Sequence, residues 1–147
     1  NRGQLKIGLP LYMSSGVASK KFIELAGPEN AEGILLPAGR LIVESQLPAG
    51  HPQKKLLADY IREYEKRFHQ PVSTFGGHAW DAVMLAAQAI RNGKSAEPAA
   101  IRDALEKSRG GYGTAGEFTL SPDDHSGLTE DAFAMIRVVK GDWEMLR

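Results

Sequence analysis

The 147-residue sequence has no cysteine, no net charge and no long hydrophobic run. Without cysteine, disulfides, thiolate metal sites and a cysteine nucleophile are excluded, although this absence does not fix a cellular compartment. Eighteen basic side chains balance eighteen acidic ones, so we expect neither nucleic acid nor an anionic membrane as a partner. The length fits one ordinary domain or a piece of a two-domain protein, and either can bury a real core.

Helical and strand patterns alternate along the chain, which favours an α/β fold. Apolar residues recur at helical spacing in four segments, which predicts helices at about 18–26, 51–68, 72–93 and 98–107. Short β-rich runs predict strands at about 5–12, 33–36, 40–43, 116–120, 133–139 and 143–146. The last two strands are joined through Lys140-Gly141-Asp142, which predicts a terminal hairpin.

The rest of the chain is expected to pack around the segment Val72–Gly93, VSTFGGHAWDAVMLAAQAIRNG. Between Ala79 and Ile90 the only polar residues are Asp81 and Gln88. A helix with apolar residues on nearly every side is typical of a protein interior. It is too short to span a bilayer, which takes about 20 apolar residues, so the sequence predicts burial in a protein core.

The turn Ser121–Gly127 contains Asp123, Asp124 and His125, which are residue types that bind metal ions. It lacks the alternating carboxylates and the final glutamate of a calcium-binding hand. Aspartate, serine, proline and glycine are also the residues that a tight turn requires, so a plain turn is the favoured interpretation. No dinucleotide fingerprint surrounds Gly76, and we expect no cofactor or metal.

His78 and Asp81 lie three residues apart at the start of the central helix, where they can touch. This spacing suggests a general base with an orienting carboxylate, which would make the protein an enzyme. The sequence contains no nucleophile in a recognisable setting to accompany them. A structural or pocket-lining histidine is therefore the favoured interpretation, and we expect no catalytic residue.

Two polar turns each precede a helix, at Tyr12–Gly16 and Ser73–Gly77. Free backbone N–H groups at a helix start favour a carboxylate, and hydroxyls and an aromatic face add selectivity. The same hydroxyls are also suited to capping the helices that follow. The residue pattern leaves both interpretations open.

Five segments together resemble the carboxyl-terminal part of periplasmic solute-binding proteins of the branched-chain amino-acid (leucine, isoleucine, valine) type of ABC importer. They are SSGVASKKFIELAG with ENAEGILLPAG, then LPAGHPQKKLLADYIREYEKRF, then STFGGHAWDAVMLAAQAI, then DALEKS, then GEFTLSPDDHSG. The resemblance implies part of a two-lobe type I periplasmic-binding-protein (Venus-flytrap) fold with parallel sheets flanked by helices. It also implies a ligand clamped between lobes that close about a hinge.

The resemblance implies that residues 1–40 finish the sheet of the second lobe, that 41–120 belong to the first lobe, and that 121–147 return to the second. The first residues, Asn1 to Gln4, lack an initiator methionine and resemble the end of a helix and turn, so we expect a longer parent protein. The amino-terminal half of the family supplies contacts to the ligand's carboxylate. The chain alone is therefore expected to bind weakly, and its exposed lobe surfaces to drive self-association.

The resemblance also implies which residues contact the ligand. The leucine-type binders have a glutamate that meets the ligand's ammonium group, and Ser15 occupies that position here. Serine cannot neutralise a buried ammonium, which favours an aromatic or other organic acid over an α-amino acid. Phe75 matches the aromatic residue that packs on the ligand. The neighbouring candidates are Tyr12, Ser14, Gly16 and His78.

The implied function is that of a non-enzymatic, periplasmic solute-binding component that delivers a small carboxylate to ABC permease membrane subunits. The same fold also serves in extracellular sensors, so a ligand-sensing receptor module is the alternative. A membrane helix in the parent protein would favour the sensor.

Overall fold

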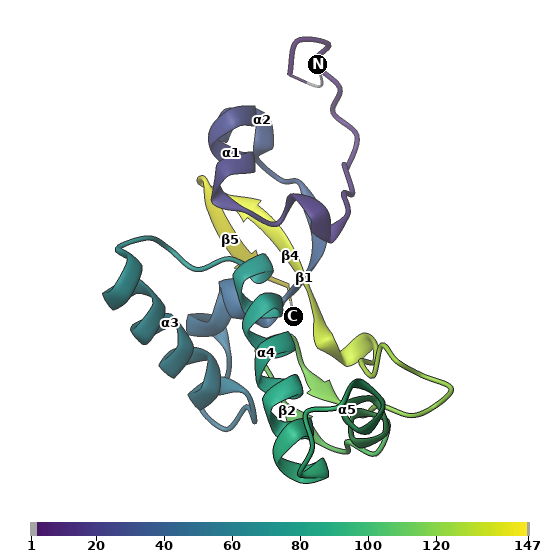
Figure 1. Cartoon of the computed structure of the whole chain (residues 1–147). Coiled ribbons are helices and arrows are strands. Elements are labelled where there is room, and N and C mark those ends of the chain that lie inside the picture. The colour runs from purple at the N-terminus through teal and green to yellow at the C-terminus, as the bar shows by residue number, and fades with distance from the viewer. Residues whose placement is uncertain (1–2, 147) are drawn as a thin grey trace.

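The apolar run Phe133–Val139 forms strand β4, the central strand of a three-stranded sheet. A computed structural model describes residues 3–146 of the chain (Figure 1). Strand β4 pairs antiparallel with β1 (Leu35–Gly39) on one side and with β5 (Asp142–Met145) on the other. A two-residue turn with positive φ angles at Lys140 and Gly141 joins β4 to β5, which confirms the terminal hairpin.

The main hydrophobic core lies on this sheet, beneath α1 (Lys20–Ala26) and α2 (Pro28–Ala31). Alternate residues of β4, Ile136 and Val138, are completely buried, as the two-residue period of a strand requires. The Ser19 hydroxyl caps α1 by accepting a hydrogen bond of 3.3 Å from the backbone N–H of Phe22. The first predicted helix is therefore confirmed, two residues shorter at its start.

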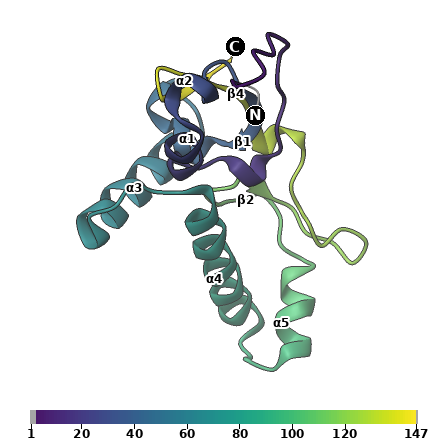
Figure 2. The same ribbon diagram turned by 90° about the horizontal axis from the view of Figure 1, so that it is seen from above.

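The remaining helices extend away from the sheet (Figure 2). After β1 the chain forms η2 (Arg40–Gln46) and then α3 (Lys54–Phe68), whose Leu57 is buried in a second, smaller cluster with Leu41 and Leu47. The other elements are α4 (Thr74–Gly93), α5 (Pro98–Leu105), β2 (Gly111–Tyr112), β3 (Glu117–Phe118) and η3 (Glu130–Ala132). A further short 3-10 helix, η1 (Ser15–Val17), precedes α1.

The strand predicted at residues 5–12 is almost entirely wrong. Gly3 to Lys6 form a turn, and only Tyr12 makes a bridge, with Leu35. Pro10 has no N–H to donate to a neighbouring strand, and Leu5 and Leu9 are mostly exposed. The expectation that Asn1 to Gln4 end a preceding helix falls partly on residues 1 and 2, which lie outside the described residues.

Two further predictions need correction. The run 40–43 lies in the 3-10 helix η2, because a short apolar run such as this fits a helical turn as well as a strand. Within residues 3–146 the strand pairing also differs from the parallel sheets that the resemblance implies for the whole two-lobe fold. Every strand ladder there is antiparallel, and the only parallel pairing is the Tyr12–Leu35 bridge. A short turn at 140–141 can only return the chain antiparallel, which explains the β4–β5 pairing.

Helix α4 differs most from its prediction. Its Asp81 is only 3% exposed, whereas the apolar side chains of Val83, Met84 and Ile90 are 68%, 41% and 38% exposed. Helix α4 packs against α5 and η2, and its Trp80 contacts Tyr60 of α3.

No helix within residues 3–146 is long and apolar enough to cross a membrane.

Candidate functional site

The first polar turn directly follows a short parallel pairing with β1. The backbone N–H of Leu35 donates to the carbonyl of Leu11 at 2.9 Å, and the N–H of Met13 donates to the carbonyl of Leu35 at 2.8 Å. The chain then leaves the sheet at Ser14 and turns into η1. Side chains at this point follow the carboxyl end of a parallel-paired strand, where ligands bind in open α/β sheets.

The hydroxyl groups of this turn are not used for helix capping. Ser14 precedes η1 without a side-chain capping bond, and α1 is capped by Ser19 instead. Tyr12, Ser14, Ser15 and Gly16 are all exposed. Among residues 3–146, the structure therefore leaves the two hydroxyls available to a ligand, whereas capping was the alternative explanation for them.

The second polar turn has a different role for its serine. The Ser73 hydroxyl accepts a hydrogen bond of 3.2 Å from the backbone N–H of Gly76 and so caps α4. Capping is therefore the correct interpretation for this serine. Phe75 is 55% exposed and His78 is also exposed, so both side chains remain accessible at the first turns of α4.

Both turns lie beside β1, the first after the bridge from Tyr12 to Leu35 and the second next to Gly39. A Cβ atom on Gly39, the last residue of β1, would lie 3.7 Å from the Thr74 side chain at the start of α4. Tyr12 pairs with Leu35 in parallel, so the following residues run alongside β1 toward Gly39, and η1 packs against this strand. In both ribbon views, the first turn of α4 lies close to the segment around η1 (Figures 1 and 2).

A buried carboxylate holds the start of α4 in place. Asp81 accepts hydrogen bonds from the Thr114 N–H at 2.7 Å, the Thr114 hydroxyl at 3.0 Å and the Ala115 N–H at 2.8 Å. Gln53, also buried, donates to the carbonyl of Gly113 at 2.9 Å. This network fixes the 113–116 loop against α4, next to the exposed N-terminal turns of the helix.

The suggested base and orienting carboxylate are not paired. Within residues 3–146, Asp81 takes its hydrogen bonds from Thr114 and Ala115 and not from His78, which is exposed. The supporting residues Thr114 and Gln53 were missed by sequence reasoning. The signal that could have found Thr114 is its position between glycines in Gly113-Thr114-Ala115-Gly116, a pattern that allows close backbone approach to a neighbouring side chain.

The acidic turn is held by its own hydrogen bonds. The Asp124 carboxylate accepts from the backbone N–H groups of Ser126 at 2.9 Å and Gly127 at 3.0 Å. His125 points elsewhere, and its Nε2 lies 3.1 Å from the Glu106 carboxylate. Arg102 also binds Glu106, at 2.7 Å, and chiefly through this bond lowers the pKa of that carboxyl. These contacts are those of a plain turn, as the sequence favoured.

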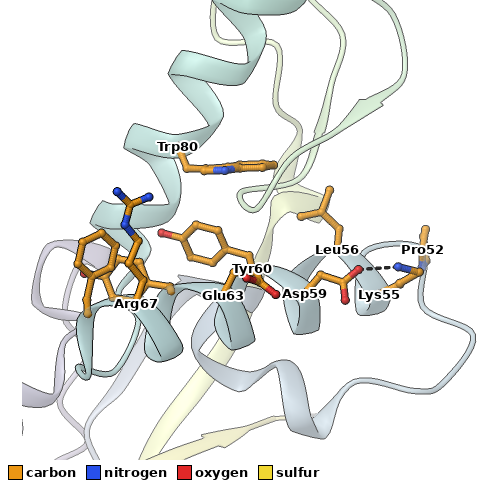
Figure 3. Close-up of a pocket in the computed structure, with 10 residues that line it drawn as sticks. Pro52, Lys55, Leu56, Asp59, Tyr60, Glu63, Arg67 and Trp80 are labelled. Atoms are coloured by element: carbon orange, nitrogen blue, oxygen red, sulfur yellow. Dashed lines mark hydrogen bonds and ion pairs between the residues drawn. The ribbon is translucent and has the colours of Figure 1, made fainter.

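A groove of about 680 Å³ lies between α3 and α4, and it does not include the predicted ligand contacts (Figure 3). The indole of Trp80 on α4 lies over the Tyr60 ring on α3, with ring centroids 5.7 Å apart. Burial in this groove raises the pKa of Tyr60. The lining residues are Pro52, Lys55, Leu56, Asp59, Tyr60, Glu63, Tyr64, Arg67, Phe68 and Trp80.

The predicted contacts are therefore exposed residues on two separate turns. Tyr12, Ser14, Ser15, Gly16, Phe75 and His78 contribute hydroxyls, backbone N–H groups, two aromatic rings and an imidazole, but no carboxylate. None of these residues lines the α3–α4 groove or the cavity of about 620 Å³ between α4 and α5. A surface of this kind holds a small ligand firmly only when a second surface closes over it.

The chain matches solved structures of extracellular ligand-binding proteins over nearly all of its length. An extracellular ligand-binding receptor from Rhodopseudomonas palustris HaA2 is 28% identical, with a TM-score of 0.86 over 99% of this chain and 43% of that one. A leucine-binding protein, LivK, from Thermotoga maritima MSB8 is 19% identical, with a TM-score of 0.78 over 99% of this chain and 38% of that one. No family model and no curated protein matches the chain.

A third match carries a bound amino acid. It is the branched-chain amino acid transporter substrate-binding protein LivJ from Streptococcus pneumoniae in complex with isoleucine, 21% identical, with a TM-score of 0.74 over 98% of this chain and 39% of that one. The chain therefore has part of the type I periplasmic binding-protein fold. Its structural neighbours are extracellular ligand-binding receptors and branched-chain amino-acid binding proteins. It spans less than half the length of these structures.

Proposed function

We propose that this chain is part of an extracytoplasmic solute-binding component of an ABC importer, which binds a small carboxylate between two lobes. The observation that carries the proposal is the match of 99% of the chain to an extracellular ligand-binding receptor with a TM-score of 0.86. The neighbours are ligand-binding proteins rather than enzymes. The proposal is therefore a non-catalytic, periplasmic protein whose partners are ABC permease membrane subunits.

The ligand contacts are proposed to be Ser15 and Phe75, with Tyr12, Ser14, Gly16 and His78 beside them. Support comes from the exposed hydroxyls of Ser14 and Ser15 and from the exposed ring of Phe75. The absence of an acidic side chain in both turns favours an aromatic or other organic acid over an α-amino acid, because a buried ammonium requires a counter-charge. A branched-chain amino acid is the alternative ligand.

The proposed lobes are residues 1–40 and 121–147 in the second lobe, and 41–120 in the first. The division of the core supports this assignment. One buried cluster joins residues 18–38 to the strands β4 and β5 and includes Val43 of η2 from the first lobe, whereas the other contains Leu41, Leu47 and Leu57. A ligand held between the two parts would couple its binding to lobe closure.

A ligand-sensing receptor module is the second candidate. The solved neighbour with 28% identity is itself described as an extracellular ligand-binding receptor, which favours this alternative as much as transport. Both candidates use the same binding surface. They differ in the partner that recognises the closed lobes, which is a permease in one case and a signalling domain in the other.

The test is a thermal-shift screen of the full two-lobe protein that carries this chain. The panel contains aliphatic amino acids, aromatic acids and short organic acids. Binding to the folded state alone raises the melting temperature, by an amount that grows with the ratio of ligand concentration to Kd. A response to one of the carboxylates supports the proposal. If no small carboxylate raises the melting temperature, the proposal fails.

A further inference from the structure

The outer edge of β5 is bonded to side chains. Strand β5 pairs with β4 on one side, and no strand within residues 3–146 pairs with its other side. Gln46, the last residue of η2, donates from Nε2 to the carbonyl of Trp143 at 2.8 Å and accepts at Oε1 from the N–H of Met145 at 2.8 Å. The N–H of Trp143 donates to the Asp142 carboxylate at 2.6 Å. Three backbone groups of β5 are therefore bonded to side chains instead of to a further strand.

The two bonds of Gln46 have the pattern of a parallel strand pair. In such a pair, one residue donates to the carbonyl before its partner residue and accepts from the N–H after it. The amide of Gln46 does both around Glu144, which lies between Trp143 and Met145. A side-chain amide combines a donor and an acceptor in one plane, as a peptide does. Gln46 thus takes the place of a strand residue, although its own backbone belongs to a 3-10 helix.

The segment that carries Gln46 also contacts two of the helices. Leu41 of η2 is buried in the same cluster as Leu57 of α3, and the Glu44 carboxylate lies 2.9 Å from the Lys54 ammonium at the start of α3. At the start of α4, a Cβ atom on Gly77 would lie 2.8 Å from a methyl carbon of Leu41. Any contact that fixes η2 on the sheet therefore also places α3 and the first turns of α4.

We propose that Gln46 is a positioning residue that sets the direction of η2, and through η2 the placement of α3 and the start of α4 relative to the sheet. Val43 is buried in the main core and holds the middle of η2 at one point. Gln46 adds a second point three residues further on, so the segment cannot turn about the first. One consequence rests on the proposed function: the contact then fixes Phe75 relative to Ser15 across the two lobes.

The first experiment is hydrogen exchange of the two-lobe protein, followed by mass spectrometry without ligand. Gln46→Leu keeps a side chain of similar size but removes the amide. Exchange should become faster by about threefold or more in the peptide that contains Met145 and in the peptides that begin α3 and α4. A peptide from α1 should be unchanged. The matched control is Gln88→Leu, because the exposed amide of Gln88 bonds only within α4, to Asn92 and Arg91.

The second experiment uses Gln46→Glu at two pH values. At about pH 7 the ionised carboxyl accepts from the N–H of Met145 but cannot donate to the carbonyl of Trp143, so this variant should exchange like Gln46→Leu. At about pH 4 a carboxyl group becomes protonated and supplies both a donor and an acceptor. Protection of the start of α4, relative to the wild type at the same pH, should then return. A side chain that only fills space would show no such change.

Far-UV circular dichroism checks that each variant is folded. The proposal is overturned if Gln46→Leu exchanges like the wild type, if faster exchange is confined to β5, or if the Gln46→Glu variant shows no recovery at the lower pH. These measurements contain no ligand, so they decide the role of Gln46 by themselves. Failure of the proposed function would appear instead in the thermal-shift screen.

Discussion

The Asp81 carboxylate accepts hydrogen bonds from both the backbone N–H and the hydroxyl of Thr114, at 2.7 Å and 3.0 Å. These two residues are 33 positions apart and join α4 to the loop before β3. Because Asp81 lies two turns beyond the start of α4, this contact fixes the direction in which Phe75 and His78 face. A charged side chain thus anchors the apolar helix to the rest of the chain.

Replacing Asp81 with alanine should destabilise the fold. The change leaves two backbone N–H groups and one hydroxyl without their buried acceptor, which we expect to lower the free energy of unfolding by about 2 to 4 kcal/mol. Urea unfolding followed by circular dichroism measures the change. The control is Asp103→Ala, at an exposed position on α5, which should alter stability by less than about 0.5 kcal/mol. Equal effects of the two substitutions would contradict the anchoring role of Asp81.

Replacing Gly77 with alanine should also destabilise the protein. The added Cβ would lie 2.5 Å from the Thr114 hydroxyl oxygen and 2.8 Å from a methyl carbon of Leu41, both too close. We expect a loss of about 1 to 3 kcal/mol, as is typical of overpacking. Gly50→Ala is the matched control, since its Cβ would meet nothing within 4 Å. If Gly77→Ala leaves the free energy of unfolding unchanged in the same urea titration, the N-terminal end of α4 is not tightly packed.

Acid stability should depend on Glu106. Its hydrogen bond with Arg102, and then that with His125, hold the pKa of this carboxyl below its ordinary value of 4.5. The unfolded chain therefore binds the proton more readily. This contribution to stability is fully present above the ordinary pKa and is lost as the pH falls through the lowered one. Melting temperature as a function of pH should fall less steeply in Glu106→Gln than in the wild type.

The comparison for this pH series is Glu65→Gln, on the exposed side of α3. This substitution should leave the slope close to that of the wild type. A Glu106→Gln profile that runs parallel to the wild-type profile over the acidic range would show that the contact with Arg102 does not persist in solution.

Ser15→Glu should change which ligands the two-lobe protein binds. A carboxylate at this position would supply the counter-charge that an α-amino group needs, so branched-chain amino acids should gain affinity and organic acids should lose it. Isothermal titration calorimetry with leucine and an aromatic acid measures both effects. Ser15→Thr keeps the hydroxyl and serves as the control. If the glutamate variant and the wild type bind the two ligands alike, Ser15 does not contact the ligand.

Periodicity predicted the helices well because it depends on local spacing. The four predicted helices exist, and the cap of α1 and the terminal hairpin follow from local residue types. Periodicity could not predict which side of α4 is covered. It assigned burial to the apolar residues, but Asp81 is buried and Val83 is exposed. Burial depends on the neighbouring elements that are present, and those contacts are not local in sequence.

For the candidate site, too, local residue types could be predicted from the sequence and non-local contacts could not. Residue types identified the two polar turns, and the structure places the first beside β1 through the Tyr12–Leu35 bridge and the second next to Gly39. The role of Ser73 as a cap and the free hydroxyl of Ser14 could not be separated from sequence, because both residues precede helices. The hydrogen-bond partner of Asp81 also could not be predicted from sequence, because Thr114 approaches Asp81 only after the loop folds back onto α4.

The central claim is that Phe75 forms part of a ligand site. The direct test is calorimetric titration of the two-lobe protein with the carboxylate that gives the largest thermal shift, comparing wild type, Phe75→Ala and Phe68→Ala. Phe68 is an equally exposed aromatic residue at the end of α3. The account predicts that Phe75→Ala weakens binding by about tenfold or more at unchanged stability, and that Phe68→Ala binds like the wild type. Full affinity in Phe75→Ala would contradict it.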